Sequence, residues 1–60
     1  RKSIIVKNSK FSGDIIERCD LEFKCPGNGI SVNQISKVVG RKVNRDLLPG
    51  TLLLKDDLYE

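Results

Sequence analysis

Hydrophobic residues occur along the chain in short stretches of two or three, with polar and turn-forming residues between them. In the first ten residues Ile4 and Val6 lie on one phase of a weak alternation, which predicts a short strand with one buried face. Further on, Leu21, Phe23 and Cys25 share a phase while charged residues separate them, the period-two pattern of a half-buried strand. These patterns predict a mostly β fold.

Two short helical segments are expected between the strands. The polar residues 18–20 suit a single helical turn. One longer helix is expected over residues 32–39, because Ser31 followed three residues later by Gln34 is a capping-box pattern and Gly40 is suited to end a helix. This helix can have two turns at most.

The C-terminal part of the chain is expected to alternate strands and turns. A strand opens at Val43, residues 48–50 form a Pro-Gly turn, and residues 52–54 form another strand ahead of the polar stretch 55–57. The predicted fold class is therefore mostly β with short helical turns.

The last elements repeat the first ones at a spacing of 37 residues. The identical or similar pairs are Val6 and Val43, Phe11 and Leu48, Gly13 and Gly50, Arg18 and Lys55, Asp20 and Asp57, and Leu21 and Leu58. Neither copy of about 20 residues could bury its apolar face alone, so we expect the two to pair around a pseudo-twofold axis into one core. Coincidence in a chain rich in Leu and Ile is the alternative, and the matching Gly and Asp positions count against it.

The composition predicts one small folded domain over residues 1–60. Branched aliphatic residues make up 18 of the 60, too many for a disordered tail. No apolar run exceeds three residues, far short of the roughly 18 that a spanning helix needs, so we expect no membrane segment. Because the chain also lacks an initiating Met and a leader-like stretch, we expect a piece excised from a longer protein.

Charge and residue types limit the classes of function. With 11 Lys and Arg against 8 Asp and Glu the net charge is +3, but both signs are interleaved and only three aromatic residues are available for base stacking. We therefore expect no nucleic-acid partner. The neighbours Arg45 and Asp46 suit a surface ion pair of little energetic weight. The absence of His removes the commonest general acid or base near neutral pH, so self-contained catalysis is not expected.

The two cysteines do not predict a metal centre. Cys19 and Cys25 match neither a C-x-x-C redox motif nor a zinc site, and no second Cys pair or His completes one. We expect no metal and no cofactor in this chain. Disulfide-stabilised domains of this length usually carry more cysteines, so two reduced thiols and a cytoplasmic location are expected.

Several short motifs follow one another in a specific order. They are the two copies described above, the Pro-Gly-x-Gly turn at 26–29 between them, the helix end Val39-Gly40-Arg41-Lys42-Val43, and Arg45-Asp46-Leu47. Together they resemble the SAF, or antifreeze-like, domain at the C-terminus of the sialic acid synthase (N-acetylneuraminate synthase) family, over nearly the whole chain. The resemblance implies a compact, pretzel-like β-clip fold, the fold of fish type III antifreeze proteins.

The resemblance also implies a role within a larger enzyme. Synthases of this family condense phosphoenolpyruvate with an N-acylated hexosamine on a TIM barrel, using a divalent metal, Mn²⁺ or Mg²⁺. Their SAF domain lies over the barrel of the partner subunit in a domain-swapped homodimer. The resemblance thus implies a non-catalytic lid and dimerisation domain, whose partners are that barrel and the amino-sugar substrate.

In this family the SAF domain contributes to the substrate site chiefly through an Arg in a Lys-Arg-Pro-Gly-x-Gly segment. Here the segment reads Lys24-Cys25-Pro26-Gly27-Asn28-Gly29, so Cys25 stands at the Arg position. The resemblance implies substrate-binding roles for Lys24, Cys25 and Asn28, with a small, weakly donating thiol in place of a guanidinium fork. The residues alone also allow a buried structural thiol at Cys25, a solvated Lys24, and plain turn geometry for the Pro and the two glycines.

Two non-enzymatic binding functions remain as alternatives. One is a periplasmic assembly module of the flagellar or pilus type, and the other is an ice-binding antifreeze protein. Ice recognition needs a flat, mostly apolar, uncharged face, and Asp14, Glu17 and Arg18 place charge beside the first Gly turn.

Overall fold

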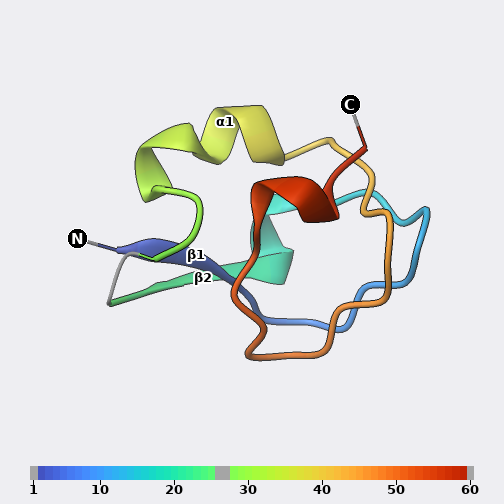
Figure 1. Ribbon diagram of the computed structural model, residues 1–60, viewed down its shortest axis with the longest axis horizontal. Helices are drawn as coiled ribbons and strands as arrows, with labels where there is room; N and C mark the ends of the chain where they lie inside the picture. The colour runs from blue at the N-terminus through green and yellow to red at the C-terminus, as the bar shows by residue number, and fades with distance from the viewer. Residues whose placement is uncertain (1, 26–27, 60) are drawn as a thin grey trace.

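The computed structural model describes residues 2–25 and 28–59. Within these residues the chain forms one two-stranded antiparallel sheet, one short α-helix and three 3-10 turns, joined by extended segments (Figure 1). In chain order the elements are β1 (Ser3–Val6), η1 (Arg18–Asp20), β2 (Leu21–Lys24), η2 (Val32–Gln34), α1 (Ile35–Val38) and η3 (Lys55–Asp57). This content agrees with the predicted mostly β class with short helical turns.

Strand β2 is the predicted half-buried strand, and it pairs antiparallel with β1. Ile4 lies opposite Phe23 in this register. Burial decreases along β2 from Leu21, which is buried, through Phe23, which is half-buried, to the exposed Lys24. The strand ends there, one residue before Cys25, because its last residues extend beyond the core.

Strand β1 is buried along its whole length, so the prediction of a single buried face is wrong. All four of its residues are buried, including Ile5 on the phase that was expected to face water. The reason is a second neighbour that the local pattern does not reveal. Ile5 forms a β-bridge with Leu52, and the N–H of Val6 donates to the carbonyl of Thr51 at 2.9 Å. The segment around residue 52 therefore covers the side of β1 away from β2.

Several backbone hydrogen bonds recur at a spacing of 37 residues. The bond from Gly13 N to Val43 O (2.7 Å) matches the bond from Gly50 N to Val6 O (2.7 Å). The bond from Val43 N to Asp14 O (3.0 Å) likewise matches the bond from Val6 N to Thr51 O (2.9 Å). Between Lys10 and Leu47 the two bonds are reciprocal (2.9 and 2.7 Å). Gly13 and Gly50 have φ angles of 94° and 89°, a left-handed conformation that favours glycine in both turns.

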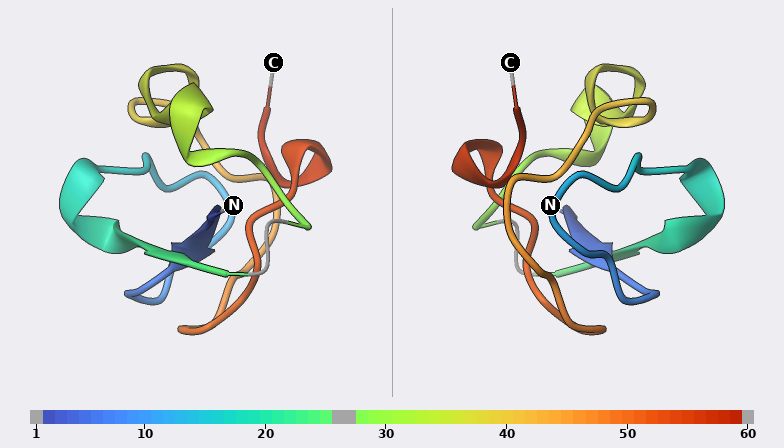
Figure 2. Two further views of the ribbon diagram at one scale, coloured as in Figure 1. Left: turned by 90° about the vertical axis from the view of Figure 1, so that its left-hand side faces the viewer. Right: turned by 90° about the vertical axis from the view of Figure 1, so that its right-hand side faces the viewer.

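The core is made almost entirely of branched aliphatic side chains from both halves of the chain. It consists of Ile4, Val6, Ile16, Leu21, Val38, Val43, Leu47, Leu53 and Leu58. Figure 2 shows the first part of the chain (blue to cyan) on one side of the molecule and the last part (orange to red) on the other. Phe23 packs against the edge of this core, with the guanidinium of Arg18 4.7 Å from its ring centre.

The predicted helix is present as two short pieces, η2 and α1. The hydroxyl of Ser31 accepts a hydrogen bond from the N–H of Asn33 at 3.3 Å, as an N-cap does. Helical structure ends at Val38, and Gly40 follows with a φ of 93°. Both the start and the stop predicted from the sequence are thus confirmed to within one residue.

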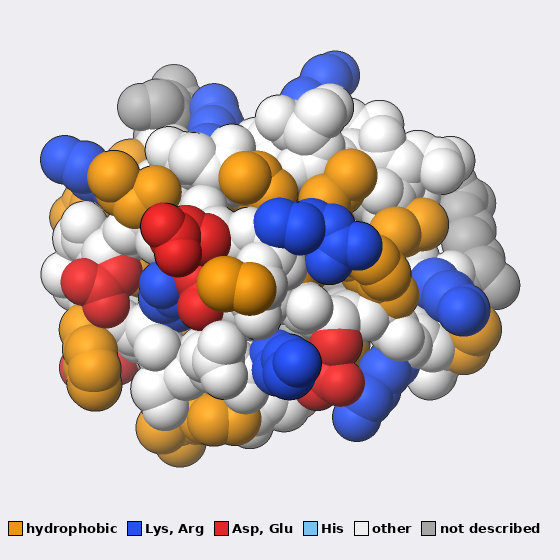
Figure 3. Space-filling view, turned by 180° about the vertical axis from the view of Figure 1, so that it is seen from behind, with side chains coloured by type: hydrophobic (Ala, Val, Ile, Leu, Met, Phe, Trp, Pro, Cys, Tyr) orange, Lys and Arg blue, Asp and Glu red, His pale blue; other side chains and the backbone are white. Residues whose placement is uncertain are grey.

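The surface carries charges of both signs. Figure 3 shows Lys and Arg side chains beside Asp and Glu side chains on one face, with hydrophobic side chains between them. Among the described residues, none of the helical segments has the length and apolar character needed to cross a membrane.

Candidate functional site

The loop identified by the resemblance follows the exposed end of β2. Lys24 is exposed, and its Nζ lies 4.0 Å from the carboxylate of Glu22. Cys25 is exposed as well, so the interpretation of a buried structural thiol is wrong. The period-two pattern places Cys25 in phase with Leu21, but the strand has left the core before it reaches Cys25.

Gly29 fixes the point at which this loop returns to the body of the domain. Its N–H donates to the hydroxyl of Ser3 at 3.1 Å. A Cβ at this position would lie 2.8 Å from the carbonyl oxygen of Leu53, a separation that only glycine permits. The close approach leaves Asn28 at the edge of a surface groove. The predicted turn at Pro26 and Gly27 lies outside the described residues.

A groove of about 870 Å³ is lined by residues of the segment that carries η2 and α1 and of the segment that carries η3. Apolar side chains from both segments line it, among them Val38, Val39, Leu54 and Leu58. Val38 and Leu58 belong to the core, whereas Val39 and Leu54 are 37% and 43% exposed. The groove therefore presents accessible apolar surface above the core.

Three cations stand along this groove. Lys37, Arg41 and Lys55 all line it, and no carboxylate is found among its described lining residues. Of the three predicted site residues, Asn28 lines the groove, while Lys24 and Cys25 do not. The sequence analysis missed the three cations, because residues 37 and 55 are brought together only by the tertiary fold. Their spacing along the chain carries no local signal for a shared site.

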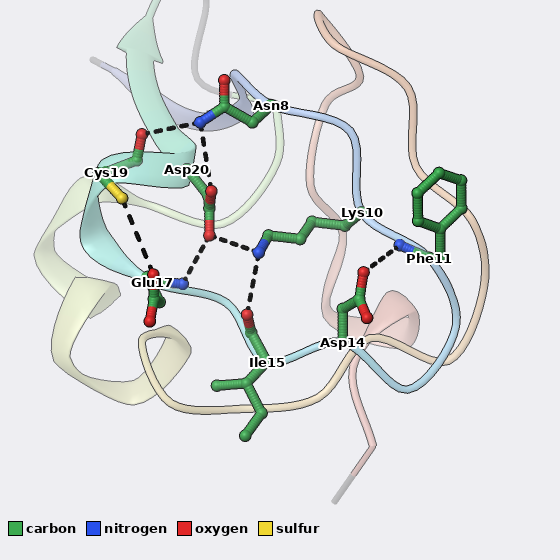
Figure 4. A network of polar contacts seen from close by, with 8 residues as sticks. All are labelled: Asn8, Lys10, Phe11, Asp14, Ile15, Glu17, Cys19 and Asp20. Carbon is green, nitrogen blue, oxygen red and sulfur yellow. Dashed lines mark hydrogen bonds and ion pairs between the residues drawn. The ribbon is translucent and has the colours of Figure 1, made fainter.

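A second polar cluster surrounds the carboxylate of Asp20 at η1 (Figure 4). Its Oδ2 lies 2.6 Å from the ammonium of Lys10 and accepts the N–H of Glu17 at 3.0 Å. Its Oδ1 accepts a hydrogen bond from the side-chain amide of Asn8 at 3.2 Å. Lys10 Nζ also donates to the carbonyl of Ile15 at 3.1 Å. Both partners of the ion pair are largely buried, with 15% of the Lys10 side chain and 9% of the Asp20 side chain exposed.

The hydrogen bond between these two residues shifts both of their pKa values. It lowers the pKa of the Asp20 carboxyl below its ordinary value, although burial acts in the opposite direction. The same bond raises the pKa of the Lys10 ammonium above its ordinary value. The pair is therefore ionised on both sides at neutral pH and holds η1 against the preceding chain.

The residues at η1 do not fit a divalent metal. Glu17, Cys19 and Asp20 offer ligand atoms within 4.8 Å of one another. However, both oxygens of Asp20 already accept hydrogen bonds or pair with Lys10, and a metal ion would have to displace that ammonium. This cluster stabilises a turn. The described part of this chain therefore offers no set of ligands that fits the Mn²⁺ or Mg²⁺ implied by the resemblance.

The corresponding turn η3 is held by a similar carboxylate. Asp57 accepts the N–H of Leu54 at 3.0 Å and the Nε–H of Arg45 at 2.6 Å. The expectation that Arg45 pairs with its neighbour Asp46 is therefore wrong. Asp46 instead accepts the N–H of Ser12 at 2.9 Å.

The groove combines several kinds of side chain. The described residues bring together a groove with apolar walls, cations at its rim and amide and hydroxyl groups near Asn28. The buried ion pair at η1 is fully occupied in holding the backbone. This arrangement can recognise and orient a ligand or a partner surface.

Comparison with known proteins agrees with the resemblance drawn from the sequence. A family model described as the SAF domain matches residues 12–58. The chain is 37% identical over 54 residues to the N,N'-diacetyllegionaminic acid synthase of Legionella pneumophila, covering 90% of this chain and 15% of the relative. It is 31% identical over 58 residues to an uncharacterized protein of Methanocaldococcus jannaschii, covering 97% of this chain and 17% of the relative. This chain thus spans less than a fifth of the length of each relative. Because the family model covers most of its length, the chain belongs to the SAF domain family.

Proposed function

We propose that this chain is the accessory SAF domain of an enzyme of the sialic acid synthase family. The observation that carries the proposal is its 37% identity to part of the N,N'-diacetyllegionaminic acid synthase. In this role the domain acts as a lid and a dimerisation element, lying over the barrel of the partner subunit in a domain-swapped homodimer. The whole enzyme condenses phosphoenolpyruvate with an N-acylated hexosamine in the cytoplasm, and the chemistry takes place on the barrel.

The fold that goes with this role is the pretzel-like β-clip with an internal pseudo-twofold repeat. Its support is the set of backbone hydrogen bonds that recur at a spacing of 37 residues, centred on the reciprocal pair between Lys10 and Leu47. In a pseudo-twofold arrangement such a reciprocal pair lies on the axis, because the shift that relates the halves converts one bond into the other.

The substrate contact of this domain is assigned to the loop of Lys24, Cys25 and Asn28. All three residues are exposed, so a partner surface can reach them. Cys25 offers a small thiol where the family carries an Arg, so the N-acyl group is recognised by fewer strong donors from this loop. The divalent metal of the family belongs to the barrel in this proposal, because the carboxylate cluster at η1 is already occupied by Lys10.

A domain exchange tests the proposal directly. The matching segment of the Legionella pneumophila synthase is replaced by this chain, and a deletion of the same segment serves as the control. Phosphate release from phosphoenolpyruvate with Mn²⁺ and a diacetylated amino hexose is measured, together with the oligomeric state. We expect the exchanged enzyme to remain dimeric and to turn over well above the deletion variant. Equal activity and equal dimerisation of the two would contradict the proposal.

The exchanged enzyme also tests the substrate loop. In it, Cys25→Arg should raise kcat/KM for an N-acetylhexosamine by about tenfold to a hundredfold, because a charge-assisted donor in a desolvated site is worth about 1.5–3 kcal/mol. Lys7→Arg serves as a matched control, since Lys7 is an exposed residue remote in sequence from this loop. If Cys25→Arg leaves the kinetics unchanged, the loop does not contact the substrate and the role of the domain is dimerisation alone.

The alternative of an ice-binding protein is disfavoured by the surface beside the first Gly turn. Asp14, Glu17 and Arg18 are all exposed there, and charged side chains interrupt the flat apolar face that ice binding requires. An assembly module of the flagellar or pilus type remains the second class, and failure of the domain exchange would favour it.

A further inference from the structure

The groove between α1 and η3 has a charge pattern that the proposed lid role does not explain. Lys37, Arg41 and Lys55 line it. None of the three forms an ion pair with a carboxylate in the part of the chain that the structure describes. A neighbouring smaller hollow shares Arg41 and Lys55, and among its described lining residues Asp56 supplies the one carboxylate. Three cations along a groove whose described lining residues include no acid make the groove attractive to an anion.

The same groove has an apolar side. Val39 and Leu54 expose 37% and 43% of their surface into solvent, and the buried Val38 and Leu58 lie among its lining residues. An inorganic anion would leave this apolar surface in contact with water. A ligand that satisfies both features must carry a negative charge together with methyl groups or other small apolar groups.

Polar groups complete the lining. Asn28 and Gln34 contribute side-chain amides, and Ser31 contributes a hydroxyl that already accepts one hydrogen bond from Asn33. Amides both donate and accept, which suits the hydroxyl and amide groups of a sugar. The volume of about 870 Å³ lies in the range typical of small-molecule sites, about 300–1,000 Å³. An extended polyanion would be matched by a longer and more purely basic track.

We propose that this groove binds an N-acylated sugar acid, the chemical class of the product of the synthase in which the domain is proposed to act. The inference rests on the proposed function for that identification. The carboxylate lies toward Arg41 and Lys55, and the acyl methyl groups lie on Leu54 and Val39. The relative's name supplies such a molecule, a diacetylated acid. The groove is thus a second ligand site on the lid, which shares Asn28 with the substrate loop but does not include Lys24 or Cys25, and product bound there can act on the enzyme.

The binding test uses the 60-residue chain labelled with ¹⁵N and N-acetylneuraminic acid as the probe. We expect amide signals of residues 36–41 and 54–58 to shift with the acid. N-acetylmannosamine, which lacks the carboxylate, and pyruvate, which lacks the acyl group, should each bind at least about tenfold more weakly if charge and apolar contact both contribute. Equal binding of pyruvate and the sugar acid would overturn the proposal, because the site would then be a simple anion site.

Matched variants locate the binding. Arg41→Gln combined with Lys55→Gln should weaken binding of N-acetylneuraminic acid by about tenfold, since two cation contacts are lost. Lys2→Gln combined with Lys7→Gln makes the same change in net charge at exposed positions that do not line the groove, and should leave binding unchanged. The same spectra report whether each variant is folded.

Two outcomes would contradict a site at the groove. One is equal weakening of binding by both double variants. The other is a shift of the signals with protein concentration alone, which would indicate a second copy of the chain in the groove.

The domain exchange separates this inference from the proposed function. In an active exchanged enzyme, the Arg41 and Lys55 double variant should weaken inhibition by added sugar acid, whereas the Lys2 and Lys7 double variant should leave that inhibition unchanged. If the exchanged enzyme is active and its product inhibition is the same with and without these two substitutions, the inference is overturned and the proposed function stands. Groove binding by a chain that fails to support the synthase would contradict the proposed function, and with it the identification of the acid as product.

Discussion

The turns η1 and η3 have similar backbone conformations, but the carboxylate in each turn is paired with a different kind of side chain. In each, a buried aspartate at the third position accepts the N–H of the residue before the turn at 3.0 Å, Asp20 from Glu17 and Asp57 from Leu54. The φ angles of these two preceding residues are −110° and −112°. The shared feature is thus the carboxylate that satisfies the first backbone donor of the turn.

The partners of the two aspartates differ. Asn8 and Arg45 are 37 residues apart, and each donates to the Oδ1 atom of its aspartate. Arg45 is charged and 52% exposed, so it can balance Asp57 alone. Asn8 is neutral, and the charge of Asp20 is balanced by Lys10, which is only 15% exposed. Thus both turns need the carboxylate, whereas the position of the opposing charge differs between the halves.

The largest effect should come from removing the carboxylate of Asp20, with removal of the Asp57 carboxylate as the comparison. Asp20→Ala should destabilise the chain by about 3 kcal/mol, because it leaves the Lys10 ammonium largely buried without its carboxylate. Asp57→Ala should cost about 1 kcal/mol, the loss of a cap, because the exposed Arg45 can turn into water. Thermal melts should separate the two variants by roughly 10 °C, given about 4–8 °C per kcal/mol for a domain of this size.

Asp20→Asn provides the control for this pair. It keeps one oxygen acceptor for the backbone N–H of Glu17, removes the charge and replaces the other oxygen, which accepts from Asn8, by an NH2 group. Its stability should therefore lie between that of the native chain and Asp20→Ala. Equal melting temperatures for Asp20→Ala and Asp57→Ala would contradict the distinction drawn between the two turns.

A smaller and more symmetrical effect is expected at the two Gly turns. Gly13→Val and Gly50→Val should each cost about 1–2 kcal/mol, because a β-branched residue is strained at positive φ. A Cβ meets no atom within 4 Å at either position, so the cost is conformational and should be alike in the two halves. Gly13→Asn, which tolerates this conformation better, should cost less. One neutral and one severe Val variant in urea unfolding would argue against equivalent turns.

Much of the local structure could be predicted from the sequence. The N-cap at Ser31, the stop at Gly40 and the single turn at η1 depend on neighbouring residues, and each is found where the pattern placed it. The burial of β1 could not be predicted in this way, because it depends on Leu52, which lies far along the chain. The 37-residue spacing carried the one long-range signal in the sequence.

The candidate site was less accessible to sequence reasoning. Resemblance led to Lys24, Cys25 and Asn28, but the groove beside Asn28 requires Lys55 to lie near α1. Arg45 illustrates the same limit, since adjacency in the chain suggested Asp46 while the fold supplies Asp57. The partner of a charged side chain is set by the tertiary fold. Spacing along the chain predicts that partner only within regular helices and strands.

The smallest effect should appear in the pH dependence of stability. Because the folded-state pKa of Asp20 is lowered by its hydrogen bond to Lys10, its contribution is present above the unfolded-state pKa, near 3.9, and is lost as the pH falls through the folded-state value. Lys10→Gln removes that cause, so the free energy of unfolding should fall less steeply on the acid side. Lys7→Gln removes the same charge from an exposed residue and should retain the native profile. Urea unfolding of the three chains from about pH 7 down to about pH 2 measures the difference. Identical acid-side slopes for Lys10→Gln and Lys7→Gln would contradict the role of Lys10 in lowering the pKa of Asp20.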